Sequence, residues 1–472
     1  MKTLNESYTF FEKLNLEDLK KLTCLRPDIR YNVKVQAGII DQYNYYYNKV
    51  DNGFVVPTGL VEYLGYYKKP EIPRSHREKL TEIIDSFGLP FKPYDYQYNA
   101  VIEAYFYRRL FIKAATGAGK SLIIGLITKL LTKANLKGII IVPNIGLTKQ
   151  FDDDIKSYKL NIETRLIGGE NNIKEFDKPL TISTWQSVSR MKSELSKLDF
   201  VIVDEAHGIK GNELFDICNK CQNAKYKIGL SGTLPEEDDD MMKLMSTFGV
   251  PKTYITPRGL IDRGLATDVK INIIKLDYKN LIINSDQYSS HLKAIKEYKP
   301  RTDFIVKLSD QVSKSGNTLV LFQHTQHGFD LFYGLFHLRK LESDRRTYKD
   351  LIQQKFNHIY FINGLIEGEN REIIRKILEN ETNAIIVANY AVMSTGVNIK
   401  ALHNMILASP LKSYTTITQS IGRGLRLHKD KEIFKLYDIS DQIGFFKHQL
   451  NHRLQKSYNP EGYDIFTSSY TI

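Results

Sequence analysis

The sequence predicts an α/β protein with two parallel sheets in tandem, preceded by a small α+β block. Short apolar runs alternate with helical patterns from about residue 89, and a second series of this kind follows after about residue 269. The first block lacks this alternation. At 472 residues, the chain has room for about three domains, which we place at residues 1–88, 89–264 and 265–472.

Apolar runs locate the expected strands of both sheets. In the first series they cover residues 110–112, 138–142, 180–184, 200–203 and 227–230. In the second series they cover residues 318–322, 358–361, 383–387, 404–407 and 434–438. In the first block we expect a helix within residues 10–22 and strands within residues 31–40 and 53–56.

A glycine-rich segment follows the first predicted strand. Residues 115–121 read Ala-Thr-Gly-Ala-Gly-Lys-Ser, and an apolar helical pattern comes next. This order is typical of a phosphate-binding loop, in which backbone amides and a helix N-terminus contact phosphate oxygens. We expect Lys120 to reach the β- and γ-phosphates and Ser121 to hold Mg²⁺. The other loop residues expected at the nucleotide are Thr116, Gly117, Ala118 and Gly119.

Acidic residues follow the predicted strand 200–203, where the sequence reads Asp-Glu-Ala-His. The carboxyl ends of buried parallel strands face the crevice in which such sheets bind ligands. We expect Asp204 to bind Mg²⁺, directly or through water, and Glu205 to act as the base that orients the attacking water. His207 is expected to contact neighbouring motifs. The two motifs together predict a nucleoside-triphosphate site.

The composition is typical of a globular protein. Its positive net charge is consistent with a polyanionic partner. The net charge is +12 and the pI is near 9.1, although solubility alone would also explain this balance. Three cysteines cannot form a disulfide framework, which favours a reducing compartment. Cys218 and Cys221 are spaced like metal ligands, but without a second pair we expect them at a helix surface. No signal peptide or membrane span is expected.

Tyrosines crowd one segment of the first block. Tyr43, Tyr45, Tyr46 and Tyr47 lie close to Lys49. Interleaved aromatic and basic residues can stack bases and follow a nucleic-acid backbone. A β-ribbon with half-buried tyrosines explains the same pattern, and both interpretations stay open.

Two strings in the second series follow predicted strands. Residues 394–398 read Ser-Thr-Gly-Val-Asn, and residues 419–426 read Gln-Ser-Ile-Gly-Arg-Gly-Leu-Arg. Arg423 and Arg426 are three residues apart, so we expect them to share a helix face. An arginine delivered from a second domain stabilises a phosphoryl transition state. The alternative is a pair of solvated or salt-bridged arginines.

The ordered motifs of residues 94–438 resemble those of the superfamily-two helicases and translocases of the DEAD/DEAH type. Within that superfamily, the strings at Thr184-Trp185-Gln186, Phe322-Gln323-His324 and Ser394-Thr395-Gly396 are similar to those of the phage recombination and branch-migration helicases. The resemblance implies two RecA-like domains with ATP in the cleft, Mg²⁺ as cofactor, and a small DNA-binding domain in front.

The resemblance also implies roles for individual residues. It places Gln97 at the adenine and Gln419 with Arg423 and Arg426 among the catalytic groups. The residues that it implies for nucleic-acid binding are Pro143, Asn144, Gly169, Thr184, Trp185, Gln186, His324, Ser394 and Thr395. The residues that it implies for coupling hydrolysis to movement are His207, Ser231, Thr233 and Gly396.

The activity implied is ATP-driven remodelling of branched or forked duplex DNA, with single-stranded DNA or RNA as other polymers and phage recombination proteins as candidate partners. This would take place in the cytoplasm, that of the host if a phage encodes the chain. Three alternatives stay open: an RNA helicase, the motor subunit of a restriction system, and a nucleic-acid-binding protein with an inactive ATPase. Intact Lys120, Asp204 and Glu205 argue against the last.

Overall fold

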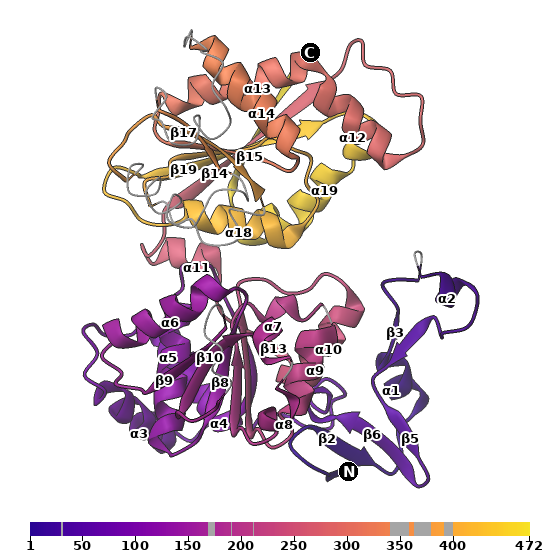
Figure 1. Cartoon of the computed structure of the whole chain (residues 1–472), viewed down its shortest axis with the longest axis vertical. Helices are drawn as coiled ribbons and strands as arrows, with labels where there is room; N and C mark the ends of the chain where they lie inside the picture. The colour runs from indigo at the N-terminus through magenta and orange to yellow at the C-terminus, as the bar shows by residue number, and fades with distance from the viewer. Residues whose placement is uncertain are drawn as a thin grey trace. The chain divides into compact units, whose positions relative to one another are not determined.

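The computed structural model describes residues 1–29, 32–168, 175–189, 191–210, 212–339, 358–362, 379–390 and 400–472. It forms two compact units, Met1–Ile255 and Thr256–Ile472. Each unit contains one seven-stranded sheet, and the first unit also contains the N-terminal block (Figure 1). The predicted division into three domains at residues 88 and 264 stays a prediction, because the chain separates into only two compact units, with the boundary after Ile255.

The N-terminal block is a small antiparallel structure. Its four-stranded sheet has the order β1 (Lys2–Thr3), β2 (Tyr8–Phe11), β6 (Gly53–Pro57), β5 (Asn48–Val50). A separate ribbon pairs β3 (Thr23–Leu25) with β4 (Tyr43–Tyr45). The expected helix within residues 10–22 is limited to α1 (Leu16–Lys21), because residues 10 and 11 belong to β2.

One expected strand of this block is wrong. The described part of residues 31–40 contains the short helix α2 (Val33–Gln36) instead of a strand. The side chain of Asn32 caps this helix by accepting a hydrogen bond from the Lys34 amide at 3.1 Å. Local capping therefore decides the conformation of a segment whose apolar alternation suggested a strand.

All strands of the first large sheet are parallel. The order is β13 (Pro251–Ile255), β7 (Arg109–Ala114), β12 (Tyr226–Ser231), β11 (Phe200–Val203), β8 (Gly138–Val142), β10 (Leu180–Thr184), β9 (Thr164–Ile167). The five predicted strands are confirmed as the central members. The sequence missed β9 and β13, which lie at the two edges, where partial exposure weakens the apolar signal.

Helices cover both faces of the first sheet. On one side lie α5 (Lys120–Lys133) and α6 (Ile145–Ser157), and on the other α9 (Asn212–Lys220) and α10 (Asp238–Phe248) (Figure 1). The other helices of this unit are α3 (Arg74–Asp85), α4 (Asp95–Tyr107), α7 (Trp185–Val188) and α8 (Lys192–Leu195). Short 3₁₀ turns occur at Thr58–Leu60 (η1) and Ala206–Lys210 (η2).

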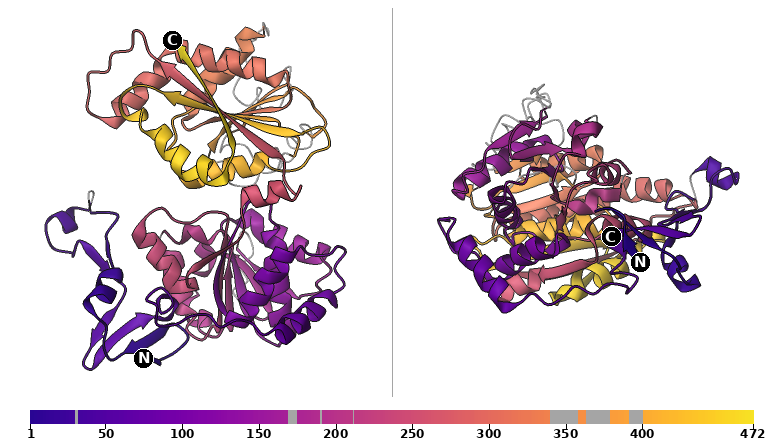
Figure 2. Two further views of the ribbon diagram at one scale, coloured as in Figure 1. Left: turned by 180° about the vertical axis from the view of Figure 1, so that it is seen from behind. Right: turned by 90° about the horizontal axis from the view of Figure 1, so that it is seen from below.

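The N-terminal block shares a hydrophobic core with the first sheet. Phe11, Val56 and Leu60 belong to the same buried cluster as Phe111 and Phe248. A Cβ atom on Gly59 would lie 2.2 Å from the carbonyl oxygen of Met245 on α10, so the two backbones touch. The indigo block therefore lies against α10 as part of one packed unit (Figure 2).

Polar groups join the same two parts. The Tyr46 hydroxyl donates to Asp239 on α10, at 2.8 Å from Oδ1, and Asn44 Nδ2 donates to the same oxygen at 2.7 Å. Deeper in the unit, the buried Lys227 ammonium donates to Ser7 Oγ at 2.9 Å and to the Cys218 carbonyl at 3.0 Å.

The expected surface position of the two spaced cysteines is wrong. Cys218 and Cys221 are fully buried in the core of the first unit. Burial raises the pKa of both thiols, to about 11 for Cys221, which makes them unreactive core residues.

The second large sheet is also parallel throughout. The order is β16 (Ile359–Ile362), β17 (Ile385–Asn389), β15 (Thr318–Phe322), β18 (Asn404–Leu407), β19 (Ile433–Asp441), β14 (Asp268–Asp277), β20 (Asp464–Thr471). The five strands predicted for this sheet are confirmed within one or two residues at most ends. The sequence missed β14 and β20.

Helices again cover both faces. On one side lie α13 (Lys299–Ser313) and α14 (Thr325–Leu338), and on the other α18 (Tyr414–Gly424) and α19 (Gln449–Arg453) (Figure 1). α11 (Pro257–Asp262) opens the unit, and α12 (Tyr288–Glu297) follows β14. Irregular turns at Gly444–Phe446 (η3), Leu454–Tyr458 (η4) and Asn459–Glu461 (η5) flank α19. Across the described residues, no helix has the length and apolar character that crossing a bilayer requires.

A buried ion pair holds the carboxyl-end edge of the second sheet together. Arg301 on α13 is completely buried and donates two hydrogen bonds to Asp441, at 2.7 and 3.0 Å. The same guanidinium donates to the Ala408 carbonyl at 2.8 Å, and the Tyr278 hydroxyl donates to Asp441 at 2.6 Å. These bonds join the ends of β14, β18 and β19 to α13.

We expect Arg301→Met to destabilise the second unit strongly, because it leaves the Asp441 carboxylate buried without its cation. Loss of one partner of a buried pair costs about 3–5 kcal/mol. Chemical denaturation monitored by far-UV circular dichroism measures the change in the free energy of unfolding. Arg74→Met is the matched control, since the Arg74 side chain in the Arg74–Glu78 pair is 92% exposed. Equal midpoints for both variants would contradict the assigned role of Arg301.

Candidate functional site

The glycine-rich loop has the conformation that a phosphate cradle requires. Gly117 and Gly119 have φ angles of 88° and 75°, in the left-handed region that glycine adopts without strain. Gly119 is the N-cap of α5, so the free amides of the first helical turn face the loop. The predicted strand, loop and helix are therefore all present between β7 and α5.

Gln97 supports this loop from α4. Its Nε2 donates to the Ala118 carbonyl at 2.9 Å, and its Oε1 accepts a bond from the Tyr94 amide at 2.9 Å. The Tyr96 hydroxyl donates to the same Ala118 carbonyl at 3.0 Å. A Cβ on Gly119 would lie 2.4 Å from Gln97 Nε2, so glycine is required there. Gln97 thus shapes the loop, and its contact with adenine stays a prediction.

Asp204 and Glu205 lie at the carboxyl end of β11. The Asp204 amide donates to the Ile141 carbonyl at 2.9 Å, which anchors the acidic segment to β8. Asp204 Oδ1 is buried and has no hydrogen-bond partner among the described residues. Burial, and then the charge of Glu205, raises the pKa of Asp204. A buried carboxylate oxygen without a donor is suited to a cation.

Glu205 is held by several groups at once. Its Oε1 lies 3.8 Å from Lys120 Nζ of the phosphate loop. Burial alone would raise the pKa of Glu205, but Lys120 and then His207 and Ser231 outweigh it and lower the pKa. Glu205 is therefore ionised at neutral pH, as a general base must be. Its φ angle of 49° lies in the left-handed region, which is strained for a residue with a Cβ.

The Ser231 hydroxyl joins the predicted coupling residues. It donates to Glu205 Oε2 at 3.1 Å and accepts a bond from the Thr233 amide at 3.1 Å. His207 Nδ1 lies 2.7 Å from the same hydroxyl. With the hydroxyl proton directed at Glu205, His207 carries its proton on Nδ1. The structure therefore brings His207, Ser231, Thr233 and Glu205 into one hydrogen-bonded cluster.

The residues predicted to bind nucleic acid in this unit lie beside one another. Val142 and Thr184 are register partners at the ends of β8 and β10, so Pro143 and Trp185 leave the sheet side by side. Thr184 is buried and caps α7 by accepting from the Ser187 amide at 3.4 Å. Trp185 packs against the core, whereas Pro143 and Gln186 are exposed.

Asn144 caps α6, and Gly168 allows α6 and α7 to approach each other. Asn144 Oδ1 accepts from the Leu147 amide at 3.2 Å. A Cβ on Gly168 would lie 2.6 Å from Ile145 and 2.7 Å from Ser187. Gly169, Ser394, Thr395 and Gly396 were also predicted to be functional, and they lie outside the described residues.

In the second unit, His324 follows β15 and occupies the N-cap position of α14 without a capping bond from its side chain. Burial, and then the nearby charge of Lys296, lowers the pKa of His324. His324 Nε2 has no hydrogen-bond partner in the part of the chain that the structure describes. The neighbouring His327 belongs to the network of the Arg301–Asp441 pair, which sequence reasoning missed because its members are up to 140 residues apart.

The expectation that Arg423 and Arg426 share a helix face is wrong. α18 ends at Gly424, and Arg426 lies beyond its C-cap. The Thr267 amide and hydroxyl donate to the carbonyls of Leu425 and Arg426, at 2.8 and 3.2 Å, just past the end of the helix. Gln419 and Arg423 are four residues apart within α18, so these two share a face.

Comparisons with known proteins agree with this geometry. Residues 90–236 match the family described as "Type III restriction enzyme, res subunit", and residues 301–428 match "Helicase conserved C-terminal domain". The chain is 32% identical over 365 residues to the ATP-dependent DNA helicase uvsW of Enterobacteria phage T4, covering 75% of this chain and 69% of that protein.

Solved structures show the same fold. The DUF1998 helicase MrfA bound to DNA has a TM-score of 0.57 and 14% identity, covering 85% of this chain and 56% of that one. S. cerevisiae Dbp5 bound to RNA and ADP BeF3 has a TM-score of 0.54 and 14% identity, covering 84% and 93%.

The chain therefore belongs to the superfamily-two helicases, built from two RecA-like sheets. Within them it belongs to the family of the phage T4 helicase uvsW, and it is an ATP-dependent helicase.

We expect Lys120→Ala to abolish ATP hydrolysis while leaving the fold intact, because the Lys120 ammonium lies near Glu205 and its side chain is not part of the hydrophobic core. Glu205→Gln should bind ATP and turn over slowly, because the attacking water loses its base. Steady-state phosphate release, together with binding of a fluorescent ATP analogue, measures both steps. Glu194→Gln, on the surface of the same unit, is the control. Near-parental turnover of Glu205→Gln would refute the assignment of the base.

Proposed function

We propose that this helicase translocates on DNA and remodels branched DNA, through branch migration, fork regression and unwinding of D-loops or R-loops, in phage recombination, repair and replication. The observation that carries the proposal is the identity to the DNA helicase uvsW over 69% of that protein. The cluster of Glu205, Ser231 and His207 supports it, because it ties the base to a segment outside the nucleotide site.

ATP with Mg²⁺ is the proposed cofactor. The residues present fit this group: the left-handed backbone of Gly117 and Gly119 shapes the loop, Lys120 supplies a cation, and Asp204 has a buried oxygen without a donor among the described residues. Mg²⁺ would neutralise charge on the phosphates when bound. Asp204 and the Ser121 hydroxyl would hold it, Lys120 would hold the phosphate oxygens, and Glu205 would take a proton from water.

The Ser231 hydroxyl is the proposed link between hydrolysis and movement. It touches Glu205 on one side and the Thr233 amide on the other, and α10 follows directly. A change at Glu205 therefore alters the hydrogen bonds at the start of the segment that leads to α10. Because α10 carries Asp239, the partner of Tyr46, the N-terminal block is in mechanical contact with this segment.

The N-terminal block is proposed to contact DNA through its exposed tyrosines. Tyr45 is 48% exposed, whereas Tyr46 is buried against α10, so the tyrosines have different roles. Tyr43 and Tyr45 are available for stacking, and Tyr46 holds the block in place. Removing the whole block would expose the shared core, so substitutions of Tyr43 and Tyr45 are the better test.

Two other candidate functions have specific support. The match of residues 90–236 to a type III restriction subunit family supports a restriction motor, and the fold shared with RNA-bound Dbp5 is compatible with an RNA helicase. The DNA helicase uvsW is the more similar protein, and this favours the proposal.

We expect ATP hydrolysis to rise on addition of forked or four-way DNA, and more than on addition of RNA of equal length. Binding should weaken as salt increases, because phosphate contacts release counterions. Phosphate release across single-stranded, duplex, forked and four-way DNA, with RNA controls, measures this. Stronger stimulation by RNA would support the RNA helicase, and equal stimulation by four-way DNA and plain duplex would contradict branch specificity.

Anisotropy of labelled four-way DNA, together with phosphate release without DNA, tests the tyrosines. Tyr43→Ala combined with Tyr45→Ala should weaken binding of junction DNA and leave hydrolysis without DNA unchanged. Tyr63→Ala, an exposed tyrosine of the same block, is the matched control. Equal affinity of both variants for junction DNA would show that Tyr43 and Tyr45 have only a structural role in the β3–β4 ribbon.

We expect Arg423→Ala to lose most DNA-stimulated hydrolysis and to keep ATP binding, because the first unit supplies the phosphate loop. Loss of an arginine finger costs about 10³–10⁵ in turnover. Since Arg423 shares a face of α18 with Gln419 and Arg426 does not, a smaller loss in Arg426→Ala is expected. Stimulated phosphate release measures both. Normal hydrolysis in the double variant would refute the proposal that arginines of the second unit act on ATP.

A further inference from the structure

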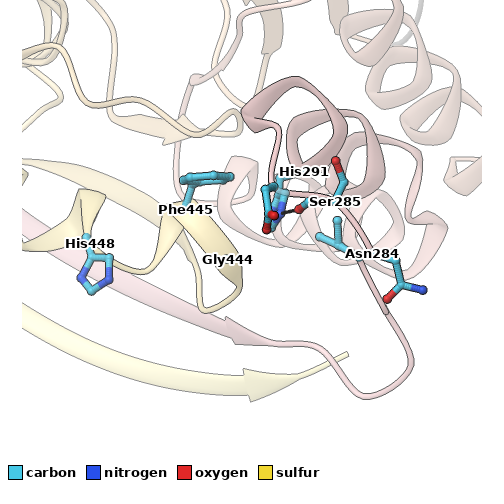
Figure 3. A pocket seen from close by; sticks show the side chains of 8 residues that line it. Asn284, Ser285, His291, Gly444, Phe445 and His448 are labelled. Atoms are coloured by element: carbon cyan, nitrogen blue, oxygen red, sulfur yellow. Dashed lines mark hydrogen bonds between the residues drawn. The ribbon is translucent and has the colours of Figure 1, made fainter.

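A pocket lies at the carboxyl-end edge of the second sheet, outside every motif discussed above. The segments that follow β14 and β19 build it, and these strands are parallel neighbours. Its volume is about 650 Å³, and its lining includes Asn284, Ser285, His291, Gly444, Phe445 and His448 (Figure 3). Ligands of parallel sheets bind at this edge, and pockets of this volume accommodate small organic groups.

Aromatic rings pack around Phe445, which lines the pocket. The Phe445 ring lies 4.7 Å from the His291 ring and 5.9 Å from the Tyr288 ring, in edge-to-face arrangements. The side chains of Phe445 and Tyr288 are 44% and 45% exposed, although both rings contact other aromatic rings. The adjacent Phe446 is buried and lies 5.5 Å from Tyr288, which anchors the turn. Exposed rings fixed in this way can stack on a flat ligand.

His291 and Gly444 fix the position of the turn. His291 Nε2 donates to the Ser285 carbonyl at 2.6 Å, while His291 Nδ1 is buried without a partner among the described residues. A Cβ on Gly444 would lie 2.1 Å from Nδ1, and the φ angle of Gly444 is 51°. Only glycine therefore allows the turn to rest on the imidazole and present Phe445 to solvent.

Two lysines belong to the segments that carry these rings. Lys447 follows the buried Phe446, and Lys296 on α12 lies near His324. Within the described part of the chain, neither Lys296 nor Lys447 forms an ion pair with a carboxylate. His324, a predicted nucleic-acid contact, follows β15 at the same edge of the same sheet. The pocket and His324 therefore lie at the same edge of this sheet, and the Asp286 carboxylate also lines the pocket.

We propose that this pocket binds an unpaired base of single-stranded nucleic acid, with the base against the exposed ring of Phe445 and an adjoining phosphate near Lys447. A base in a duplex is stacked between neighbours and exposes only its edges, so its flat face is available only when unpaired. The inference rests on the proposed function, because it adds a contact to the same polymer.

Equilibrium anisotropy of a labelled oligo(dT) of about 15 nucleotides tests this proposal on the full chain without ATP. Phe445→Ala should weaken binding about tenfold, since one stacked base contributes about that much. Affinity for a fully paired duplex of equal length should change much less. Phe466→Ala is the matched control, because Phe466 is 52% exposed on the edge strand β20 of the same unit.

Unchanged affinity of Phe445→Ala for oligo(dT), or an equal loss on oligo(dT) and duplex, would overturn the proposal. If Phe445→Ala lowers hydrolysis without DNA, Phe445→Leu replaces it, because leucine keeps apolar packing and removes the flat ring. A selective oligo(dT) loss in Phe445→Leu supports the pocket, and no loss overturns it. Failure of the proposed function has a different signature, in which no DNA stimulates hydrolysis by the unmodified chain.

Discussion

Every strand of the two large sheets runs parallel to its neighbours, and this constraint decides where chemistry can occur. The carboxyl ends of β7, β8, β10 and β11 all meet one edge of the first sheet. The phosphate loop, Asp204 and the segments at Pro143 and Trp185 must therefore share that edge. In the second sheet the same rule places His324, the end of β19 and the pocket at Phe445 together.

The sequence predicted what depends on local pattern and missed what depends on distant partners. Strands that are fully buried read as apolar runs, so all ten expected members of the large sheets are present, including the buried edge strand β16. β14 alternates apolar and polar residues over 268–277, a signal that could have been used, whereas β20 is too exposed to give one. The Arg301–Asp441 pair joins residues that are 140 positions apart in the sequence, so no local sequence pattern predicts it.

The same limit applies to the candidate site. Motif spacing located Lys120, Glu205 and Ser231, but only the fold shows that one hydroxyl joins Glu205, His207 and the Thr233 amide. Helical spacing paired Arg423 with Arg426, and the structure ends α18 between them because Thr267 binds the backbone there. The N-terminal tyrosines looked alike in sequence, yet contact with Asp239 separates Tyr46 from Tyr45.

The left-handed backbone of Glu205 has a consequence for how the chain can change. An L-residue with a φ angle of 49° carries about 1–2 kcal/mol of local strain, which glycine would relieve and asparagine would tolerate. The functional site thus holds Glu205 in a backbone conformation that residues with a Cβ atom disfavour. Under selection for heat resistance alone, position 205 would drift toward those residues and the carboxylate would be lost. Its presence marks a trade-off in which the protein retains less stability than its fold permits.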